Sequence, residues 1–240
     1  NVAVKLTFCP ERIVQGFAVR ELKTLPQIIS GFTPEAVSIA EDLFKRLGVD
    51  TITVTVQEAE FAKLFCNAWR YIQFAISNQF YMIASEHGAD YDRIHDAMTY
   101  RYSRAQSFPR AGFAGGPCLL KDTLQLAASY GNNFQLGQAA MSVNEGLPSF
   151  IVREIEEETG ESLRGKTAGI LGMAFKADID DTRDSLSYKL GKILRFHGAI
   201  VGYSDEFATD PTFVTKEDLI RSSDVVIVGV PHSAYRTLVI

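Results

Sequence analysis

Residues 58–88 read EAEFAKLFCNAWRYIQFAISNQFYMIASEHG. Apolar residues recur at helical spacing through this stretch, it contains no proline, and it stops at Gly88, a residue type that commonly follows a helix. We predict a single helix, which at about 1.5 Å per residue would be roughly 45 Å long. Since that length exceeds one small domain, we expect the helix to be a spine that joins two domains or two subunits.

The segment before the spine has the pattern of an α/β unit. Residues 2–8 (VAVKLTF) predict a buried strand, residues 35–48 predict a helix closed by Gly48, and residues 51–56 (TITVTV) predict a second strand. Strands that alternate with helices are typical of parallel sheets. We therefore expect residues 1–56 to be the remnant of an N-terminal α/β domain.

The segment after the spine changes character near residue 160. Up to that point the pattern predicts helices from near Asp90, over 121–130 and over 137–159, so residues 57–160 form a central all-α domain.

Further on, strands predicted over 166–175, over 199–205 and within 216–232 alternate with a helix over 185–198. Residues 161–240 are thus expected to form a Rossmann-like parallel α/β domain with right-handed crossovers. The predicted fold class is α/β, with the tail of an α/β domain, an all-α centre with its spine, and this C-terminal domain.

The composition is that of an ordinary globular protein. The 240 residues are 46% hydrophobic and 22% charged, and the net charge of −5 favours neither nucleic acid nor an anionic membrane as a partner. No apolar run reaches the roughly 18 residues that a membrane helix needs. The three cysteines are widely spaced and lack a CxxC motif, which favours free thiols, no metal site and a reducing compartment such as the cytoplasm.

One cysteine has unusual surroundings. Residues 112–122 read GFAGGPCLLKD, which places Cys118 after a loop of small residues and before a predicted helix. Small residues let backbone N–H groups approach a ligand, and a helix N-terminus together with Lys121 favours the thiolate form. A nucleophilic cysteine competes here with two plainer interpretations, a buried apolar residue and simple turn chemistry.

Two further polar groups stand in suitable places. Lys63 and Asn67 are four residues apart on the spine and so share one face, where they suit an oxyanion or a proton relay if a cysteine nucleophile is near. Without such a nucleophile, Lys63 would lay its stem along the apolar helix face with its ammonium in water, and Asn67 would lie at the edge of the core.

The stretch 175–185 (FKADIDDTRDS) follows a predicted strand, at the end where open α/β sheets bind ligands. There Lys176 and Arg183 suit phosphates and Asp184 suits a helix cap; a solvated loop is the alternative. No GxGxxG motif occurs.

Taken in order, five segments resemble the UDP-glucose/GDP-mannose dehydrogenase family. They are PERI (10–13), AEFAKLFCNAWR (59–70), GFAGGPCLLKD (112–122), LGMAFKADIDDTRDS (171–185) and VPHSAY (230–235). The resemblance covers nearly the whole chain and implies that most of the family's N-terminal NAD-binding Rossmann domain and the last part of its C-terminal nucleotide-sugar domain are missing from it. It also implies an enzyme that oxidises the primary alcohol of a nucleotide-linked sugar to a carboxylate with two NAD⁺, for polysaccharide biosynthesis. A homodimer through the spine helix is implied as well.

The resemblance also implies roles for single residues. Cys118 would be the nucleophile that carries the thiohemiacetal and the thioester. Lys63 and Asn67 match the pair that stabilises the oxyanion, Asp122 matches a carboxylate that handles protons and water, and Glu11 matches an acid linked to thioester hydrolysis. The implied contacts to the nucleotide sugar are Gly115, Phe175, Lys176 and, from the partner subunit, Arg101 or Arg104; those near the dinucleotide's pyrophosphate are Lys121 and Arg183.

The sugar remains open at this stage. The pair Lys121–Asp122 favours a UDP-glucose 6-dehydrogenase, whereas PERIVQG (10–16) leans towards UDP-N-acetylmannosamine, and GDP-mannose is a further alternative. Leu119 stands where many members of the family have phenylalanine.

Two hypotheses of other classes compete with the dehydrogenase. The chain would be a binding and dimerisation fragment without catalysis, or a cysteine hydrolase. The chain has four histidines, which are His87, His95, His197 and His232. None of them is placed as an evident base for Cys118, and this disfavours the hydrolase.

Overall fold

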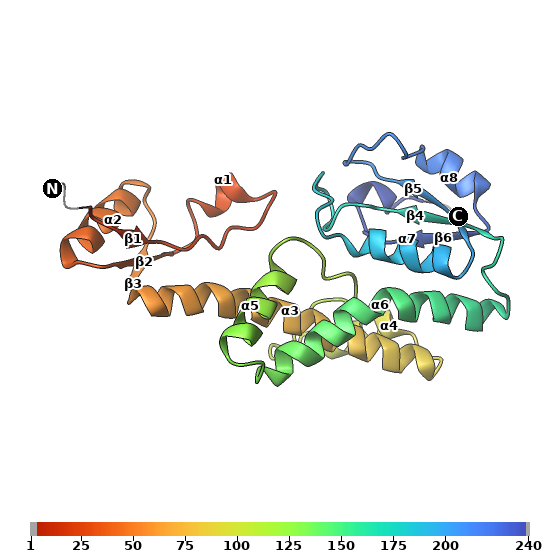
Figure 1. Cartoon of the computed structure of the whole chain (residues 1–240), viewed down its shortest axis with the longest axis horizontal. Coiled ribbons are helices and arrows are strands. Elements are labelled where there is room, and N and C mark those ends of the chain that lie inside the picture. Colours follow the sequence, from red (N-terminus) through yellow and green to blue (C-terminus); the bar gives the residue numbers. More distant parts are fainter. Residues whose placement is uncertain (1–3, 239–240) are drawn as a thin grey trace. The chain divides into compact units, whose positions relative to one another are not determined.

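The computed structural model describes residues 4–238. These fall into two compact units, one up to Asn67 and the other from Ala68 onwards. Helix α3 (Val56–Glu86) begins in the first unit and ends in the second (Figure 1). A capping box starts it, because Thr55 and Glu58 exchange side chain to backbone hydrogen bonds of 2.8 and 3.3 Å. The predicted spine is therefore one continuous helix.

The first unit contains a three-stranded sheet in the order β1-β2-β3, with bounds β1 (Thr7–Phe8), β2 (Gln27–Gly31) and β3 (Thr51–Thr53). β2 pairs parallel with β3 and antiparallel with β1. α1 (Ala18–Glu21) precedes β2, and α2 (Pro34–Arg46) follows it and contacts the sheet. The hydroxyl of Thr33 accepts the N–H of Ala36 and so caps α2.

Two expectations for this unit need correction. The predicted buried strand over 2–8 is wrong for residues 4–6, which are exposed and outside any strand, and residues 2–3 lie outside the described residues. The central strand β2 was not predicted. Its sequence QIISG has only two adjacent apolar residues and hence no alternation, although Ile29 and Ser30 are both fully buried.

The helices of the second unit pack through small residues. They are the later turns of α3, α4 (Tyr91–Thr99), α5 (Leu119–Ser129) and α6 (Gln135–Thr159). Tyr71 and Ala75 of α3 form one buried cluster with Ala114 and with Ala140 of α6. The alanines let these segments approach closely, so the loop before Cys118 belongs to the helical core. No helix within residues 4–238 is long and apolar enough to cross a membrane.

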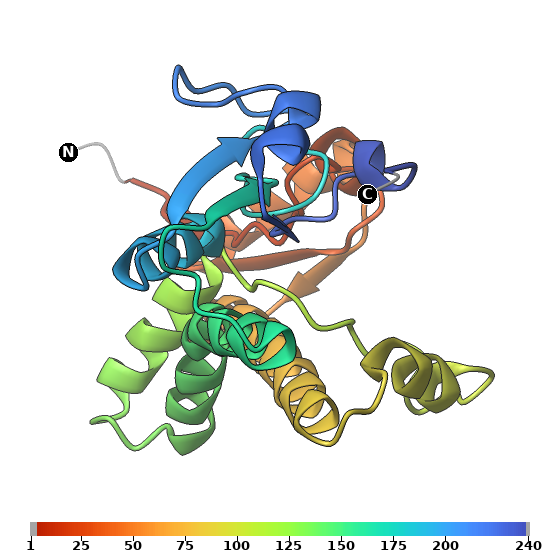
Figure 2. The ribbon, with the colours of Figure 1, turned by 90° about the vertical axis from the view of Figure 1, so that its right-hand side faces the viewer.

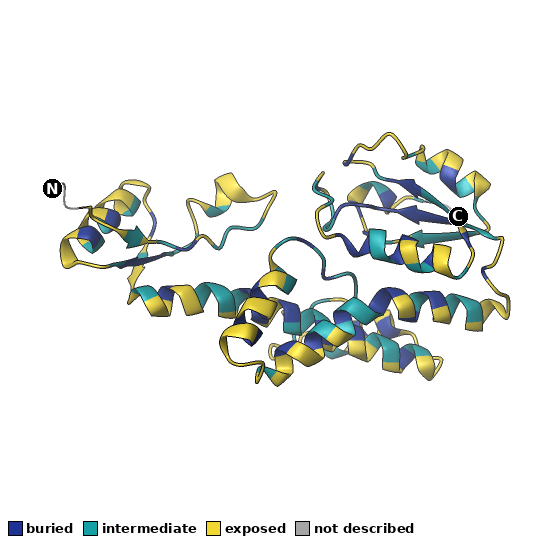
Figure 3. Ribbon diagram, in the orientation of Figure 1, coloured by how far each residue is buried: buried dark blue, intermediate teal, exposed yellow. Residues whose placement is uncertain are grey.

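A parallel sheet completes the second unit, in the order β5-β4-β6 with bounds β4 (Thr167–Leu171), β5 (Ile200–Ser204) and β6 (Val225–Val228). α7 (Leu186–Phe196) lies between the sheet and α6, and α8 (Lys216–Ser222) covers the other face; η1 (Ser233–Tyr235) follows β6 (Figures 1 and 2). β4 is almost wholly buried (Figure 3). The predicted α/β class is confirmed, while the domain boundaries at 56/57 and 160/161 stay predictions.

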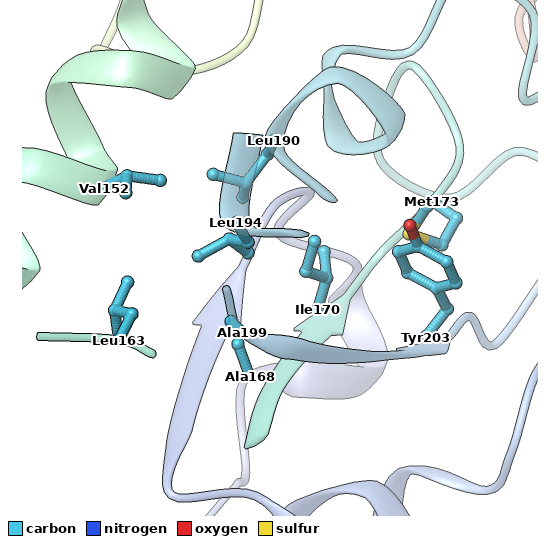
Figure 4. Close-up of a cluster of buried hydrophobic side chains, with 9 residues drawn as sticks. All are labelled: Val152, Leu163, Ala168, Ile170, Met173, Leu190, Leu194, Ala199 and Tyr203. Carbon is cyan, nitrogen blue, oxygen red and sulfur yellow. The ribbon is translucent and has the colours of Figure 1, made fainter. Parts of the chain in front are cut away.

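The core between α6, α7 and the sheet should dominate the stability of this unit. Leu190 has no exposed surface and packs among Val152, Ile170 and Leu194 (Figure 4). Leu190→Ala is expected to lower the free energy of unfolding by about 2–5 kcal/mol, because it leaves a cavity in a tightly packed core. Urea denaturation measures this. The control is Phe196→Ala on the same helix, where the side chain is 89% exposed and the change should stay within about 0.5 kcal/mol. Equal effects at the two positions would contradict the assignment of this core.

Candidate functional site

Cys118 stands at the N-terminus of an 11-residue helix, as predicted. It is the N-cap residue of α5, its side chain is exposed, and its carbonyl accepts the N–H of Asp122 at 2.9 Å. A thiol in this position meets the positive end of the helix dipole and is accessible to a ligand.

The glycine loop before Cys118 lies directly on the loop that follows β4. The N–H of Gly116 donates to the carbonyl of Asp184 at 3.1 Å. A Cβ at Gly116 would come within 2.7 Å of the ring of Phe175, and one at Gly115 within 3.0 Å of the Asp184 carbonyl oxygen. Gly116 also has φ +99°, which side chains rarely allow. These contacts bring two predicted segments, GFAGGPCLLKD and FKADIDDTRDS, together.

The loop 175–185 is held by its own hydrogen bonds. The N–H of Phe175 donates to the carbonyl of Asp181 at 2.9 Å. Two nitrogens of the Arg183 guanidinium donate hydrogen bonds to the Asp181 carboxylate, at 2.7 and 3.0 Å. The cap of α7 is Ser185, whose hydroxyl accepts the N–H of Ser187; Asp184, expected as the cap, precedes it. The hydroxyl of Ser185 also donates to the carbonyl of Ala174, which ties the helix start to the end of the strand.

Two cations lie within electrostatic range of the thiol. Asp122, 3.1 Å from the ammonium of Lys121, raises the pKa of that lysine, and the negative charge of a Cys118 thiolate adds to the effect. Asp181 raises the pKa of Arg183 in the same way, again with a contribution from Cys118. Both side chains are about 70% exposed. Both are thus accessible cations beside the loop, each paired with a carboxylate.

A pocket of 420 Å³ opens beside the glycine loop. That volume lies within the range of small-molecule sites. Lys121 of α5, Glu145 of α6 and Asp184 bring charged groups to it. Glu145 is paired with Lys189 of α7 at 2.8 Å. The pocket's remaining lining residues are Ala114, Gly115, Gly116, Pro117, Leu120, Leu124, Gln125 and Ala128.

Other predicted site residues lie in the first unit, or in the second unit at positions distant in sequence from the glycine loop. Lys63 and Asn67 stand one turn apart on α3 in the first unit, where Lys63 is half-buried and Asn67 is buried; Glu11 is exposed in the same unit. In the second unit, Arg101 and Arg104 follow α4 in an exposed segment. Each guanidinium lies over the ring of a neighbouring tyrosine, at 5.2 and 4.8 Å.

Two polar residues with buried side chains at the carboxyl edge of the second sheet received no role from the sequence, Asp205 after β5 and His232 after β6. The Asp205 carboxylate accepts the N–H groups of Met173 and Ala174 at 2.6 and 3.0 Å. It accepts three further hydrogen bonds, from Phe207, Ala208 and the Nε2 of His232. Burial alone would raise the pKa of Asp205, but these hydrogen bonds outweigh it and hold that pKa well below its ordinary value. The position of these two residues in the sequence was the signal that could have identified them, because each residue closely follows a strand.

Asp205→Asn should therefore destabilise the protein in a pH-dependent way. At pH 7 we expect a loss of about 2–4 kcal/mol in the free energy of unfolding, because a buried charge-assisted network loses its anion. A lowered native-state pKa stabilises the fold fully above the unfolded pKa, about 3.9; below that value the contribution shrinks, and it is lost completely only as the pH falls through the lowered native pKa. Urea denaturation at pH 7, 5 and 3 should show the gap between wild type and variant narrowing in acid. A constant gap would contradict the ionised state of Asp205.

Two parts of the chain match the domain models of one protein family. Residues 57–146 match the central domain of the UDP-glucose/GDP-mannose dehydrogenase family, and residues 169–240 match the family's UDP-binding domain. The UDP-N-acetyl-D-mannosamine dehydrogenase of Methanococcus maripaludis is 27% identical over 243 residues, which cover 99% of this chain and 56% of that protein.

Two solved structures are also similar. That of the UDP-D-ManNAc dehydrogenase of Pyrococcus horikoshii has a TM-score of 0.89 and 25% identity over 98% of this chain and 56% of that one. That of a UDP-glucose dehydrogenase of Pyrobaculum islandicum has a TM-score of 0.89 and 27% identity over 98% and 58%. The chain spans about half the length of these relatives. It belongs to the UDP-glucose/GDP-mannose dehydrogenase family.

Proposed function

We propose that the protein containing this chain oxidises the primary alcohol of a UDP-sugar to the uronic acid with NAD⁺, as a UDP-glucose 6-dehydrogenase-like enzyme. UDP-N-acetylmannosamine and GDP-mannose are the alternative substrates, and similar proteins carry the names of both UDP-sugar enzymes. The observation that carries the proposal is the exposed thiol of Cys118 at a helix start, on a glycine loop packed against Phe175. A nucleophile with little bulk around it can reach a sugar carbon.

Cys118 supplies covalent chemistry to this reaction. Once the alcohol is an aldehyde, the sulfur adds to its carbon; the carbonyl electrons move to oxygen, which takes up a proton, and a thiohemiacetal results. Its oxidation gives a thioester. Water then adds to the acyl carbon, the C–S bond breaks with its electrons returning to sulfur, and the acid is released. NAD⁺, when bound, would accept the hydride that the substrate carbon loses in each oxidation.

The other proposed catalytic groups stabilise charge and move protons. Lys63 and Asn67, an amine and an amide on one face of α3, suit the oxyanion of the tetrahedral intermediates. Asp122 is buried beside Lys121 and suits a role in handling protons and water, and Glu11 suits a role in thioester hydrolysis.

Ligand contacts are proposed on both loops of the site. Phe175, Lys176 and the backbone at Gly115 would hold the nucleotide sugar. Lys121 and Arg183 suit the pyrophosphate of NAD, since both are exposed cations.

We also propose a cytoplasmic homodimer. In the second unit α3 exposes Trp69, Ile76, Phe80 and Ile83, whose spacing of seven, four and three places them on one helix face. An apolar face of this kind supports a dimer contact through α3, in which Arg101 or Arg104 would reach the partner's site. A cytoplasmic location is supported by the need for a reduced thiol at Cys118.

The test is the reaction itself, measured by NADH absorbance in the protein that contains this chain. UDP-glucose, UDP-N-acetylmannosamine and GDP-mannose are supplied in turn with NAD⁺, and two NADH should form for each sugar acid. Formation of one NADH with release of the aldehyde would contradict the covalent route, and no NADH with any of the three would overturn the proposal.

A second candidate, nucleotide-sugar binding and dimerisation without catalysis, is favoured by the match of residues 169–240 to a UDP-binding domain. Calorimetry with UDP and NADH absorbance, both on the protein that contains this chain, separate the two: binding of UDP without NADH production from any of the three nucleotide sugars supports this candidate.

A further inference from the structure

The segment that leaves β4 runs along the carboxyl edge of the sheet and is tied at both ends to buried polar side chains. Its start, Met173 and Ala174, donates two N–H groups to the carboxylate of Asp205. Its end, Asp178, donates its N–H to the Nδ1 of His232 at 2.9 Å. The side chains of both Asp205 and His232 have no exposed surface.

The two buried side chains are themselves joined. The Nε2 of His232 lies 3.0 Å from the Asp205 carboxylate. Because Nδ1 accepts the N–H of Asp178, the ring proton must be on Nε2, so that Nε2 donates to Asp205. The imidazole is packed between two aromatic rings, Phe207 at 4.9 Å and Tyr235 at 5.4 Å between ring centroids. The two hydrogen bonds fix its tautomer, and together with the two ring contacts they hold its position.

A second bond closes the end of the segment. The carboxylate of Asp178 accepts the N–H of Ser233 at 2.7 Å. Asp178 has φ +59°, a conformation that costs free energy in a residue other than glycine. Its hydrogen bonds to His232 and Ser233 compensate for that cost, so loss of the His232 bond should release the strained turn.

Between the two tied ends lie Phe175 and Lys176, the residues assigned to the nucleotide sugar. We propose that Asp205 and His232 are positioning residues, which hold residues 173–178 in the form that presents Phe175 and Lys176 to the substrate. The inference rests on the proposed function, and it concerns residues that act through the loop without touching the ligand. A loop ordered in advance spares the binding step the entropy of ordering it.

The test compares variants of His232 in the protein that contains this chain. His232→Phe fills the space but removes both hydrogen bonds. His232→Asn retains a carbonyl oxygen near the position of Nδ1, which can accept the N–H of Asp178 again. The matched control is His95→Phe, which replaces another buried histidine of the second unit that contacts the carbonyl of Phe108 at 3.1 Å.

Two measurements are made on each variant. The first is amide hydrogen exchange over residues 173–178 without ligand, where His232→Phe should exchange about tenfold faster or more. The second is steady-state kinetics with the UDP-sugar, where KM should rise about five- to tenfold while kcat stays within about twofold. His232→Asn should recover part of both effects, and His95→Phe should change neither, even if it lowers thermal stability.

The outcomes separate the inference from the function on which it rests. Unchanged exchange in His232→Phe overturns the tether, and faster exchange with an unchanged KM overturns its role in substrate binding. A KM increase of the same size in His95→Phe would assign the effect to general destabilisation and would also overturn the inference. A wild-type protein that binds no UDP-sugar would reject the proposed function and the substrate role with it, while the exchange data would still decide the tether.

Discussion

Replacing Cys118 by serine is expected to abolish formation of the sugar acid and to lower kcat by about 1,000-fold or more, which corresponds to roughly 4 kcal/mol of activation free energy. A serine hydroxyl is scarcely ionised at neutral pH and adds to an aldehyde poorly without a strong base. Sulfur is also the better leaving group when water attacks the acyl intermediate. Replacing the sulfur by oxygen therefore slows both steps assigned to Cys118, its addition to the aldehyde and its release from the acyl intermediate.

The measurement follows NADH and the acid product separately, because the first oxidation does not need the thiol and some aldehyde can still form. Cys66→Ser is the matched control, since Cys66 is also a free cysteine but has no assigned role, and it should keep full activity. Circular dichroism of both variants verifies folding. Full turnover to the acid by Cys118→Ser would remove the nucleophile from the mechanism.

Gly116→Ala should be the most damaging exchange of a glycine in the site. The added Cβ meets the ring of Phe175 at 2.7 Å, and φ +99° is unfavourable for alanine. Together these terms amount to about 3 kcal/mol. If the strain is relieved by displacing Phe175 and the loop that bears Cys118, kcat/KM should fall about 100-fold.

The control for Gly116→Ala is the same substitution at Gly146 in α6, where nothing lies within 4 Å of the new Cβ. Gly146→Ala should be neutral or stabilise the protein by up to about 1 kcal/mol, because alanine favours the helix. Thermal denaturation and kinetics are measured on both. Equal activities of the two variants would show that the contact between Gly116 and Phe175 does not matter for function.

Local patterns in the sequence predicted most of this fold. The spine was predictable because its apolar period holds over the whole of α3, and the C-terminal sheet was predictable because β4, β5 and β6 are apolar runs bounded by turn residues. The first unit was predicted less well. β2 is short and lacks alternation, and the strand predicted before it is confined to Thr7–Phe8 within the described residues.

The candidate site was predictable residue by residue but not as an arrangement. The small residues around Cys118 pointed to a reactive thiol, and Lys121 and Arg183 to an anion. Nothing in the sequence shows that Gly116 lies on Phe175, since packing between distant segments depends on the whole fold. The bond between Asp205 and His232, 27 residues apart, escaped prediction for the same reason.

The contact between Gly116 and Phe175 has a consequence for how this chain can diverge. The ring occupies the volume that a side chain at position 116 would need, so side chains at the two positions compete for the same space. A larger residue at 116 can be accommodated only if the side chain at 175 is smaller than phenylalanine. Even then, the positive φ at 116 disfavours any residue other than glycine. A change at position 116 therefore requires a coordinated change at position 175, whereas position 175 can become smaller without any change at 116.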